Sequence, residues 1–235
     1  MQGNQMKWLI KLIRSLFKPK DKPIALETPI NPPQTGNNTP AIPPENSEVL
    51  KPGAHGIDIS HHNGNVDFNL IEQDFIFMKA TEGSSFVSPV HAKRMKQAID
   101  LGFPCSSYHY YKPGIDPIVQ AKHFCKHSLG DLPPVLDIED AYSNREKLIA
   151  DLQKFLDYVE EAHSQIPIIY TGYSYIKDMK LPESFSRYPL WLAWYTTPDK
   201  VKAPAPWKEW TFWQYSETAQ VKGVGKCDVN WYKAK

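Results

Sequence analysis

Short strand-forming segments alternate with polar or helix-forming segments from residue 55 onward. This alternation restricts the fold more than any other feature, because strand–helix–strand succession favours parallel pairing in an α/β fold. The strand patterns cover residues 55–60, 75–80, 104–111, 133–139, 166–172, 189–195 and 210–216. Seven or eight strands in residues 54–235 predict a compact, helix-poor (β/α) TIM-like barrel, with a doubly wound open sheet as the alternative.

Two connecting segments carry helical patterns. Residues 90–102 place apolar side chains on one face and stop at Gly102. Residues 143–163 open with Ser143 and Glu146, the S-x-x-E pattern of a capping box, which predicts a helix that starts there. The chain has no glycine-rich loop of the spacing that cradles phosphate, so a nucleotide-binding fold is disfavoured and no cofactor is predicted.

The first 53 residues differ in composition from the rest of the chain. Residues 6–18 place basic side chains on one helical face and large apolar ones on the other, so residues 1–18 predict a basic amphipathic helix. Such a helix is too short to span a bilayer and suits an anionic membrane surface or a partner; a poor export signal and an inert tail are the alternatives. Residues 19–53 hold nine prolines and no aromatic residue, which predicts a disordered Pro-rich linker before a folded domain at 54–235.

Charge and cysteine content exclude some functional classes. The formal net charge is +1, which gives no basis for nucleic-acid binding. Cys105, Cys125 and Cys227 are too few and too scattered for a disulfide framework or a zinc knuckle. One disulfide plus a free thiol stays open, so cysteine content does not decide the compartment.

Acidic residues stand where buried strands are expected to end. Side chains alternate along a strand, so Asp137 and Glu139 in "VLDIE" share one face, which we expect to point to the barrel axis. Asp58 in "GIDIS" points inward by the same reasoning, and Asp228 in "GKCDVNWY" is a third source of negative charge. Crowding of carboxylates raises the pKa of at least one of them, so one acid keeps its proton near neutral pH while another stays ionised. Glycoside hydrolysis needs this division.

Aromatic side chains and histidines near these strand ends allow further interpretations. Aromatic rings can stack on sugar faces, although a ring on a strand lies in the core more often than in a groove. The acids together with His55, His61 and His62 make a metal site an alternative. His61 and His62 are adjacent and would point apart in a strand, so we predict no metal.

Seven motifs, taken in order, resemble those of the family 25 glycoside hydrolases. They are "GIDISHHNGNVDF" (56–68), "FIFMKATEGSSF" (75–86), "YHYYKPG" (108–114), "PPVLDIED" (133–140), "PIIYTGYSYI" (167–176), "LWLAWY" (190–195) and "WTFWQYSETAQVKGVGKCDVNWY" (210–232). The resemblance covers about residues 54–235 and does not extend to residues 1–53. It implies an irregular barrel of eight strands with a reduced set of helices, and a lysozyme (N-acetylmuramidase) activity that cleaves the β-1,4 bond between N-acetylmuramic acid and N-acetylglucosamine.

The resemblance also implies roles for individual residues. Glu139 is similar to the family's general acid, and Asp137 to its partner, which acts as nucleophile or orients the substrate's acetamido oxygen. Asp58 and Asp228 match two further pocket carboxylates. Positions that match the groove lining are Lys79, Tyr108, Tyr110, Tyr170, Trp194 and Gln214.

The expected partner is therefore the glycan strand of peptidoglycan. We expect the protein to be a monomer and to be secreted or located in the cell envelope. A non-hydrolytic wall-binding module and a metal-dependent hydrolase of another polymer are the alternatives. All four acids are present, which disfavours the binding module. The adjacent histidines of "SHHNG" have no assigned role.

Overall fold

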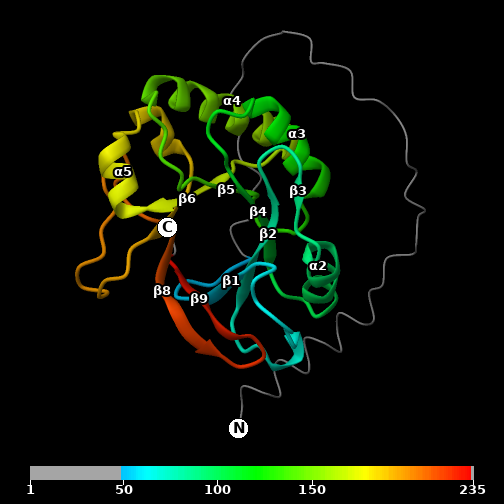
Figure 1. The fold of residues 1–235 in the computed structure, drawn as a ribbon. Coiled ribbons are helices and arrows are strands. Elements are labelled where there is room, and N and C mark those ends of the chain that lie inside the picture. Colours follow the sequence, from blue (N-terminus) through cyan, green and yellow to red (C-terminus); the bar gives the residue numbers. More distant parts are fainter. Residues whose placement is uncertain (1–48, 234–235) are drawn as a thin grey trace. The chain divides into compact units, whose positions relative to one another are not determined.

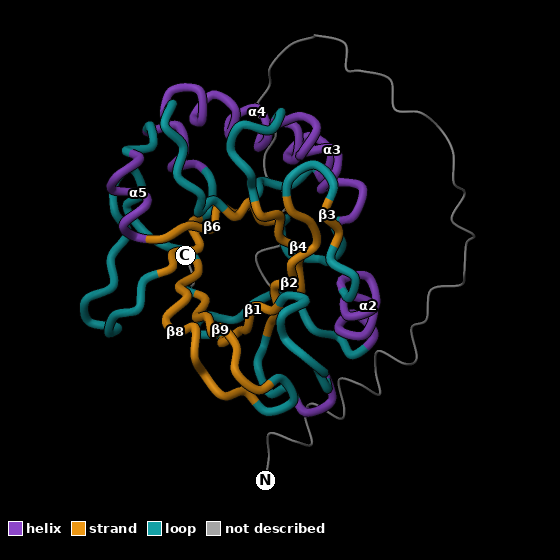
Figure 2. Tube along the Cα trace, viewed as in Figure 1, coloured by secondary structure: helices purple, strands orange, loops and turns teal. Residues whose placement is uncertain are grey.

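The computed structural model describes residues 49–233, so the predicted helix at 1–18 and most of the predicted linker at 19–53 lie outside the described residues. Eight strands close into a barrel (Figure 2). They are β1 (His55–Ile59), β2 (Phe75–Glu82), β4 (Cys105–Tyr110), β5 (Val135–Asp137), β6 (Ile168–Gly172), β7 (Leu190–Ala193), β8 (Phe212–Val221) and β9 (Gly225–Tyr232). The short strand β3 (Phe86–Val87) pairs only with the end of β2.

The barrel is mixed rather than fully parallel. From β1 through β2 and β4 to β8, each strand pairs with the next in parallel. β9 runs antiparallel between β8 and β1 and completes the closure. The predicted TIM-like barrel is confirmed, and the closed sheet excludes the doubly wound alternative.

Four α-helices cover part of the barrel, which confirms the predicted reduced set of helices. They are α2 (His91–Asp100), α3 (Pro117–His127), α4 (Arg145–His163) and α5 (Tyr173–Met179), with 3₁₀ turns at η1 (Phe68–Leu70) and η2 (Glu183–Arg187). The helices lie along the outside from β2 round to β6, whereas β8 and β9 project as a hairpin (Figure 1). Within residues 49–233, no helix combines the length and the apolar character needed to cross a membrane.

The start of α4 corrects one sequence prediction. Its N-cap is Asn144, whose side chain accepts a hydrogen bond from the Lys147 backbone N–H, whereas Ser143 was expected to cap. Asparagine caps a helix as well as serine does, and Leu148 and Leu152 lie on the buried face of α4.

Alternation along the strands separates two packing layers. In β5, Val135 faces the barrel interior, whereas Leu136 packs outward under the helices against residues such as Leu152. We call the end of the barrel at which the parallel strands begin its lower end. The lower interior is filled largely by rings and branched side chains: Phe75, Phe77, Val135, Ile168, Trp191 and Phe212. Leu50 is buried in the same cluster, although it lies within the range predicted as linker. This apolar floor keeps water out of the barrel below the next layer of inward-facing side chains.

Candidate active site

Three strands bring carboxylates to the upper end of the barrel interior. Asp58 of β1 stands directly opposite Asp228 of β9 in the strand register. Asp137 is the last residue of β5, at the C-terminal end of that strand, and Glu139 follows two residues later. The charges of these acids reach one another: Asp228 raises the pKa of both Asp58 and Glu139, and Asp58 raises that of Asp137.

Asp58 is the most firmly held of the acids. Gln214 Nε2 and Asn230 Nδ2 both donate to its Oδ2, at 3.0 and 2.8 Å. Trp191 Nε1 donates to Asn230 Oδ1 at 2.7 Å, which fixes the orientation of that amide. Burial and the charge of Asp228 nevertheless raise the pKa of Asp58 well above its ordinary value. Asp58 therefore retains a proton where an exposed aspartate would have lost it.

Gln214 connects Asp58 to two tyrosines. Its Oε1 accepts hydrogen bonds from the hydroxyls of Tyr170 at 2.9 Å and Tyr195 at 3.1 Å. Because the amide oxygen is occupied by these donors, the amide nitrogen is left to donate to Asp58. The network thus sets both the position and the hydrogen bonding of one inward carboxylate.

Asp137 is buried, with 4% of its surface exposed. Burial and the charge of Glu139 raise its pKa well above the ordinary value, while Lys79 acts in the opposite direction. Its Oδ1 has no hydrogen-bond partner among residues 49–233. A buried polar atom without a partner is uncommon and is a feature of sites that interact with a ligand.

Glu139 lies at the boundary between the barrel and solvent, and its side chain is exposed. Partial loss of hydration raises the pKa of Glu139 even so. Asp140 and Asp228 raise it further, while the contact with Asp137 and the charge of Lys79 lower it. The carboxyl group is therefore open to a substrate and still keeps its proton to a higher pH than a free glutamate.

Two predicted groove residues from β2 and β4 stand beside the acids. Tyr108 is half-buried, and all four acids raise its pKa, after the larger effect of burial, so its ring lies among them. Lys79 is 9% exposed, pairs with Glu82 at 2.7 Å, and places its ammonium 4.6 Å from the ring centroid of Tyr110. Together these side chains form a wall that combines aromatic faces with a buried cation.

The predicted residue Trp194 has different neighbours. β7 ends at Ala193, and the Trp194 ring stacks on Tyr173 of α5 with 3.9 Å between centroids. Tyr195, one residue further, is 52% exposed and contacts Gln214. A role for Trp194 in the groove stays a prediction, whereas Tyr195 joins the hydrogen-bond network of Asp58.

Asn230 and Trp191 also belong to the site and were not among the predicted residues. Asn230 shares the inward face of β9 with Asp228, two positions away, so the alternation that indicated Asp137 and Glu139 also identifies it. Trp191 lies in β7, and the sequence gives no sign that its indole would hydrogen-bond to Asn230.

The histidines require a correction. β1 ends at Ile59, so His61 and His62 lie in a turn rather than a strand, and their ring centroids are 4.0 Å apart instead of pointing apart. His123 and His127 of α3 also have the four-residue spacing of paired metal ligands, and their ring centroids are 5.2 Å apart. Among residues 49–233, no group of three or more potential ligands is placed to hold a metal ion.

The cysteines are not paired with one another. Cys105, Cys125 and Cys227 are all free thiols, and Cys105 and Cys227 are buried. Burial raises the pKa of Cys105 and of Cys227 to about 12, so neither is a reactive thiolate near neutral pH.

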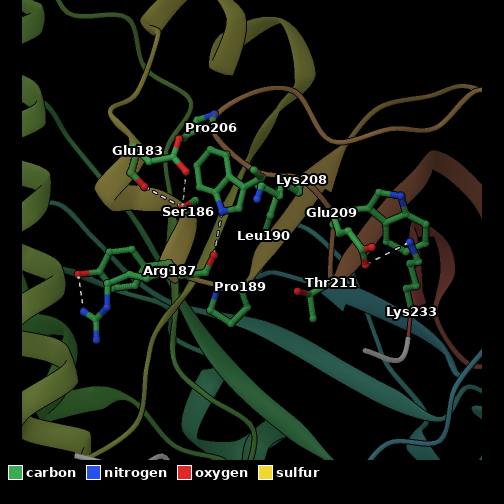
Figure 3. Close-up of a pocket in the computed structure, with 13 residues that line it drawn as sticks. Glu183, Ser186, Arg187, Pro189, Leu190, Pro206, Lys208, Glu209, Thr211 and Lys233 are labelled. Carbon is green, nitrogen blue, oxygen red and sulfur yellow. Dashed lines mark hydrogen bonds and ion pairs between the residues drawn. The ribbon is translucent and has the colours of Figure 1, made fainter. Parts of the chain in front are cut away.

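A pocket of about 400 Å³ is lined by residues that precede or begin β7 and β8 and by Lys233, which follows the antiparallel strand β9 (Figure 3). It therefore lies at the opposite end of the barrel from the acids. Trp207 Nε1 donates to the Tyr188 carbonyl at 2.8 Å on one side, and Lys233 pairs with Glu209 at 3.5 Å on the other. None of the predicted site residues lines this pocket. The carboxylates with raised pKa values thus lie away from this pocket.

Comparisons with known proteins match the barrel. The family model described as "Glycosyl hydrolases family 25" matches residues 57–224. YegX of Escherichia coli (strain K12) is 33% identical over 191 residues, which cover 75% of this chain and 68% of YegX. Lysozyme M1 of Streptomyces globisporus is 28% identical over 199 residues, covering 76% of this chain and 67% of that protein. The crystal structure of the bacterial lysozyme from Streptomyces coelicolor is similar with a TM-score of 0.72 at 27% identity, covering 77% of this chain and 92% of that one.

Proposed function

This chain belongs to glycosyl hydrolase family 25, and from that membership we propose that it is a lysozyme acting on bacterial peptidoglycan. The bond hydrolysed is the β-1,4 linkage between N-acetylmuramic acid and N-acetylglucosamine. The names of its relatives, Lysozyme M1 and the N,O-diacetylmuramidase of Chalaropsis, support this substrate. One observation carries the proposal: acids from β1, β5 and β9 meet above an apolar floor, where their pKa values are raised.

Glu139 is the proposed general acid. It is exposed enough to reach the bridging oxygen of a bound glycan, and its raised pKa keeps it protonated to a higher pH than an ordinary glutamate. Protonation of that oxygen lets the sugar leave as positive charge develops on the anomeric carbon.

Asp137 is the proposed partner of Glu139. Its unpartnered Oδ1 is available to the substrate, either to attack the anomeric carbon or to orient the acetamido oxygen that does so. Burial and the charge of Glu139 raise the pKa of Asp137, whereas the contact with Asp137 lowers the pKa of Glu139, so the protonation states of the two acids depend on each other. Beneath the site, the charge of Asp228 favours a developing oxocarbenium ion, while Asp58 keeps its proton to a higher pH than an exposed aspartate.

The proposed groove wall positions the sugar rings. Tyr108, Tyr110 and Tyr170 project inward from β4 and β6. Lys79 and Gln214 supply hydrogen-bonding groups beside them. Flat aromatic faces with polar groups at their edges suit pyranose rings.

The substitution Glu139→Gln tests the proposed function. It removes the transferable proton but keeps the side-chain shape, and we expect kcat on purified peptidoglycan to fall by about 10²–10⁴-fold with the melting temperature preserved. The matched control is Glu161→Gln, the same change at an exposed position of α4, which should leave kcat unchanged. Hydrolysis by Glu139→Gln at the wild-type rate would refute the assignment. Binding of peptidoglycan without any hydrolysis by the wild-type protein would favour the wall-binding module instead.

We also propose that residues 1–53 attach the enzyme to a membrane surface within reach of the wall. The predicted helix at 1–18 would hold the protein on an anionic membrane surface, and the linker at 19–53 would let the domain at 54–235 reach the wall. Deletion of residues 1–20 should abolish flotation with vesicles that contain anionic lipid and leave hydrolysis of soluble wall fragments intact. Unchanged flotation would refute this arrangement.

A further inference from the structure

Asp140 is the third acid of the stretch "DIED" and has no role in the proposed chemistry. We propose that Asp140 is a positioning residue for the general acid, which anchors the end of β5 and supplies a fixed negative charge beside Glu139. This inference rests on the proposed role of Glu139 and concerns how its protonation is set.

Side chains from three parts of the fold hold Asp140. The Tyr110 hydroxyl, from β4, donates to Oδ1 at 2.7 Å. Lys112, which follows β4, donates from its ammonium to Oδ2 at 2.6 Å. The Tyr175 hydroxyl, from α5, donates to the backbone carbonyl of Asp140 at 3.1 Å. With both carboxylate oxygens and its carbonyl engaged, Asp140 has one defined position.

The backbone before Asp140 is held equally well. Tyr111 N–H donates to the Asp137 carbonyl at 2.9 Å, and Ile138 N–H donates to the Tyr170 carbonyl at 3.0 Å. The Ile138 carbonyl accepts from the Thr171 hydroxyl at 2.7 Å. Contacts on both sides of Glu139 therefore keep the Asp140 carboxylate at a constant place relative to the acid, although Glu139 itself lies beyond the end of β5.

Asp140 loses its proton at a lower pH than Asp137 and Glu139 do. Partial burial acts to raise its pKa, but the hydrogen bonds from Lys112 and Tyr110 outweigh this and lower it. The resulting anion raises the pKa of Glu139. The hydrogen bonds from Lys112 and Tyr110 thus keep Asp140 negatively charged across the pH range in which Glu139 titrates.

Other charged and titratable groups surround this segment. Those around Glu139 and its partners are Asp137 on the same segment, Lys79 and Glu82 from β2, Tyr108 and Tyr110 from β4, Lys112 after β4, Tyr170 from β6, and Asp58 and Asp228 from β1 and β9. Lys112 Nζ also lies 3.8 Å from Glu82 Oε1, so Lys112 keeps an acidic neighbour when Asp140 is neutralised.

Two substitutions change the local charge in opposite directions. Asp140→Asn removes the anion and leaves Lys112 in place, so Glu139 should lose its proton more easily. Lys112→Met removes the cation and leaves the Asp140 anion, so Glu139 should hold its proton more firmly. We expect the alkaline limb of the kcat/KM profile to move down by about 0.5–1 pH unit in Asp140→Asn and up by a similar amount in Lys112→Met.

The test measures pH profiles of peptidoglycan hydrolysis for the wild type and both variants. The control is Asp100→Asn, which breaks the exposed 2.7 Å pair of Asp100 with Lys96 on α2 and should leave the profile unchanged. Titration of the Glu139 carboxyl by NMR with ¹³C-labelled glutamate follows the same pKa without any hydrolysis. It therefore separates a failure of this inference from a failure of the proposed function.

Opposite displacements of the alkaline limb, matched by the NMR titration, would support the inference. If both variants lower activity equally at every pH, or move the limb in the same direction, Asp140 is only a structural residue and the inference is wrong. Should Asp140→Asn fail to fold, Lys112→Met alone decides: an unchanged Glu139 pKa in that variant overturns the proposal.

Discussion

Individual acids of this site follow the alternation of their strands, and this made most of them predictable. Asp58 and Asp137 lie between apolar residues whose outward packing forces the acids inward. Glu139 behaves differently, because β5 ends at Asp137 and the rule no longer applies beyond it; its side chain is exposed. The ring of Trp194 lies against Tyr173 for a related reason, since β7 has ended one residue earlier.

The burial of Asp137 has a cost that a stability measurement can detect. Its pKa in the folded protein is raised above the unfolded value, so the wild type loses stability as pH rises from about 4 toward the raised pKa. Asp137→Asn removes the titration. We expect the variant to be more stable than the wild type by about 1–3 kcal/mol at pH 7.5, with a difference near zero at pH 4.

Urea unfolding at the two pH values checks this prediction. Comparing the variant with the wild type at each pH cancels the effect of His91 and His109, whose burial lowers their pKa values to about 4 and about 3. The exposed Asp100→Asn serves as the control and should show no pH-dependent difference. A variant less stable than the wild type at pH 7.5 would contradict the account.

At the scale of elements, sequence patterns located most strands, and the differences have physical reasons. β9 was expected only as a source of Asp228, although Gly223 lies in the turn between it and β8 and Gly225 opens β9, both with φ near +86°. Glycines of this kind are typical of a hairpin, and a hairpin makes β9 antiparallel. α3 was not assigned, yet Asp116 caps it and Pro117 opens it, a combination that the sequence displays.

One connection at the rim of the barrel depends on a single side chain. Arg94 of α2 is 8% exposed and donates to the backbone carbonyls of Ser60 at 2.7 Å and Asn63 at 2.6 Å, and also to that of Gly64. These bonds hold the turn that follows Asp58 and carries His61. Because the buried guanidinium makes several charged hydrogen bonds, each worth more than a neutral one, Arg94→Met should destabilise the protein by about 2–4 kcal/mol.

Hydrogen exchange provides the accompanying readout for Arg94→Met. We expect faster exchange at residues 60–64 than in the wild type, with the distant helix α4 protected as before. The matched control is Arg187→Met, which breaks the 2.6 Å ion pair with Glu160 near the surface and should cost less than about 1 kcal/mol. Equal losses in the two variants would mean that Arg94 has no special role in this turn.

For the molecule as a whole, the barrel combines two layers with opposite properties. The lower interior is packed with Phe75, Phe77 and Trp191, and the upper interior holds the acids. The sequence predicted both the barrel and the inward acids, because each depends on local alternation. It could not predict the amide network around Asp58, since Gln214 and Asn230 come together with it only when β9 closes the barrel.

The central claim is that this upper layer of acids holds a proton on Glu139 for delivery to a glycosidic oxygen. Mass spectrometry of fragments released from purified peptidoglycan tests it most directly. The account predicts muropeptides with N-acetylmuramic acid at the reducing end from the wild type, and very little release by Glu139→Gln. Fragments with N-acetylglucosamine at the reducing end, or equal release by both proteins, would contradict it.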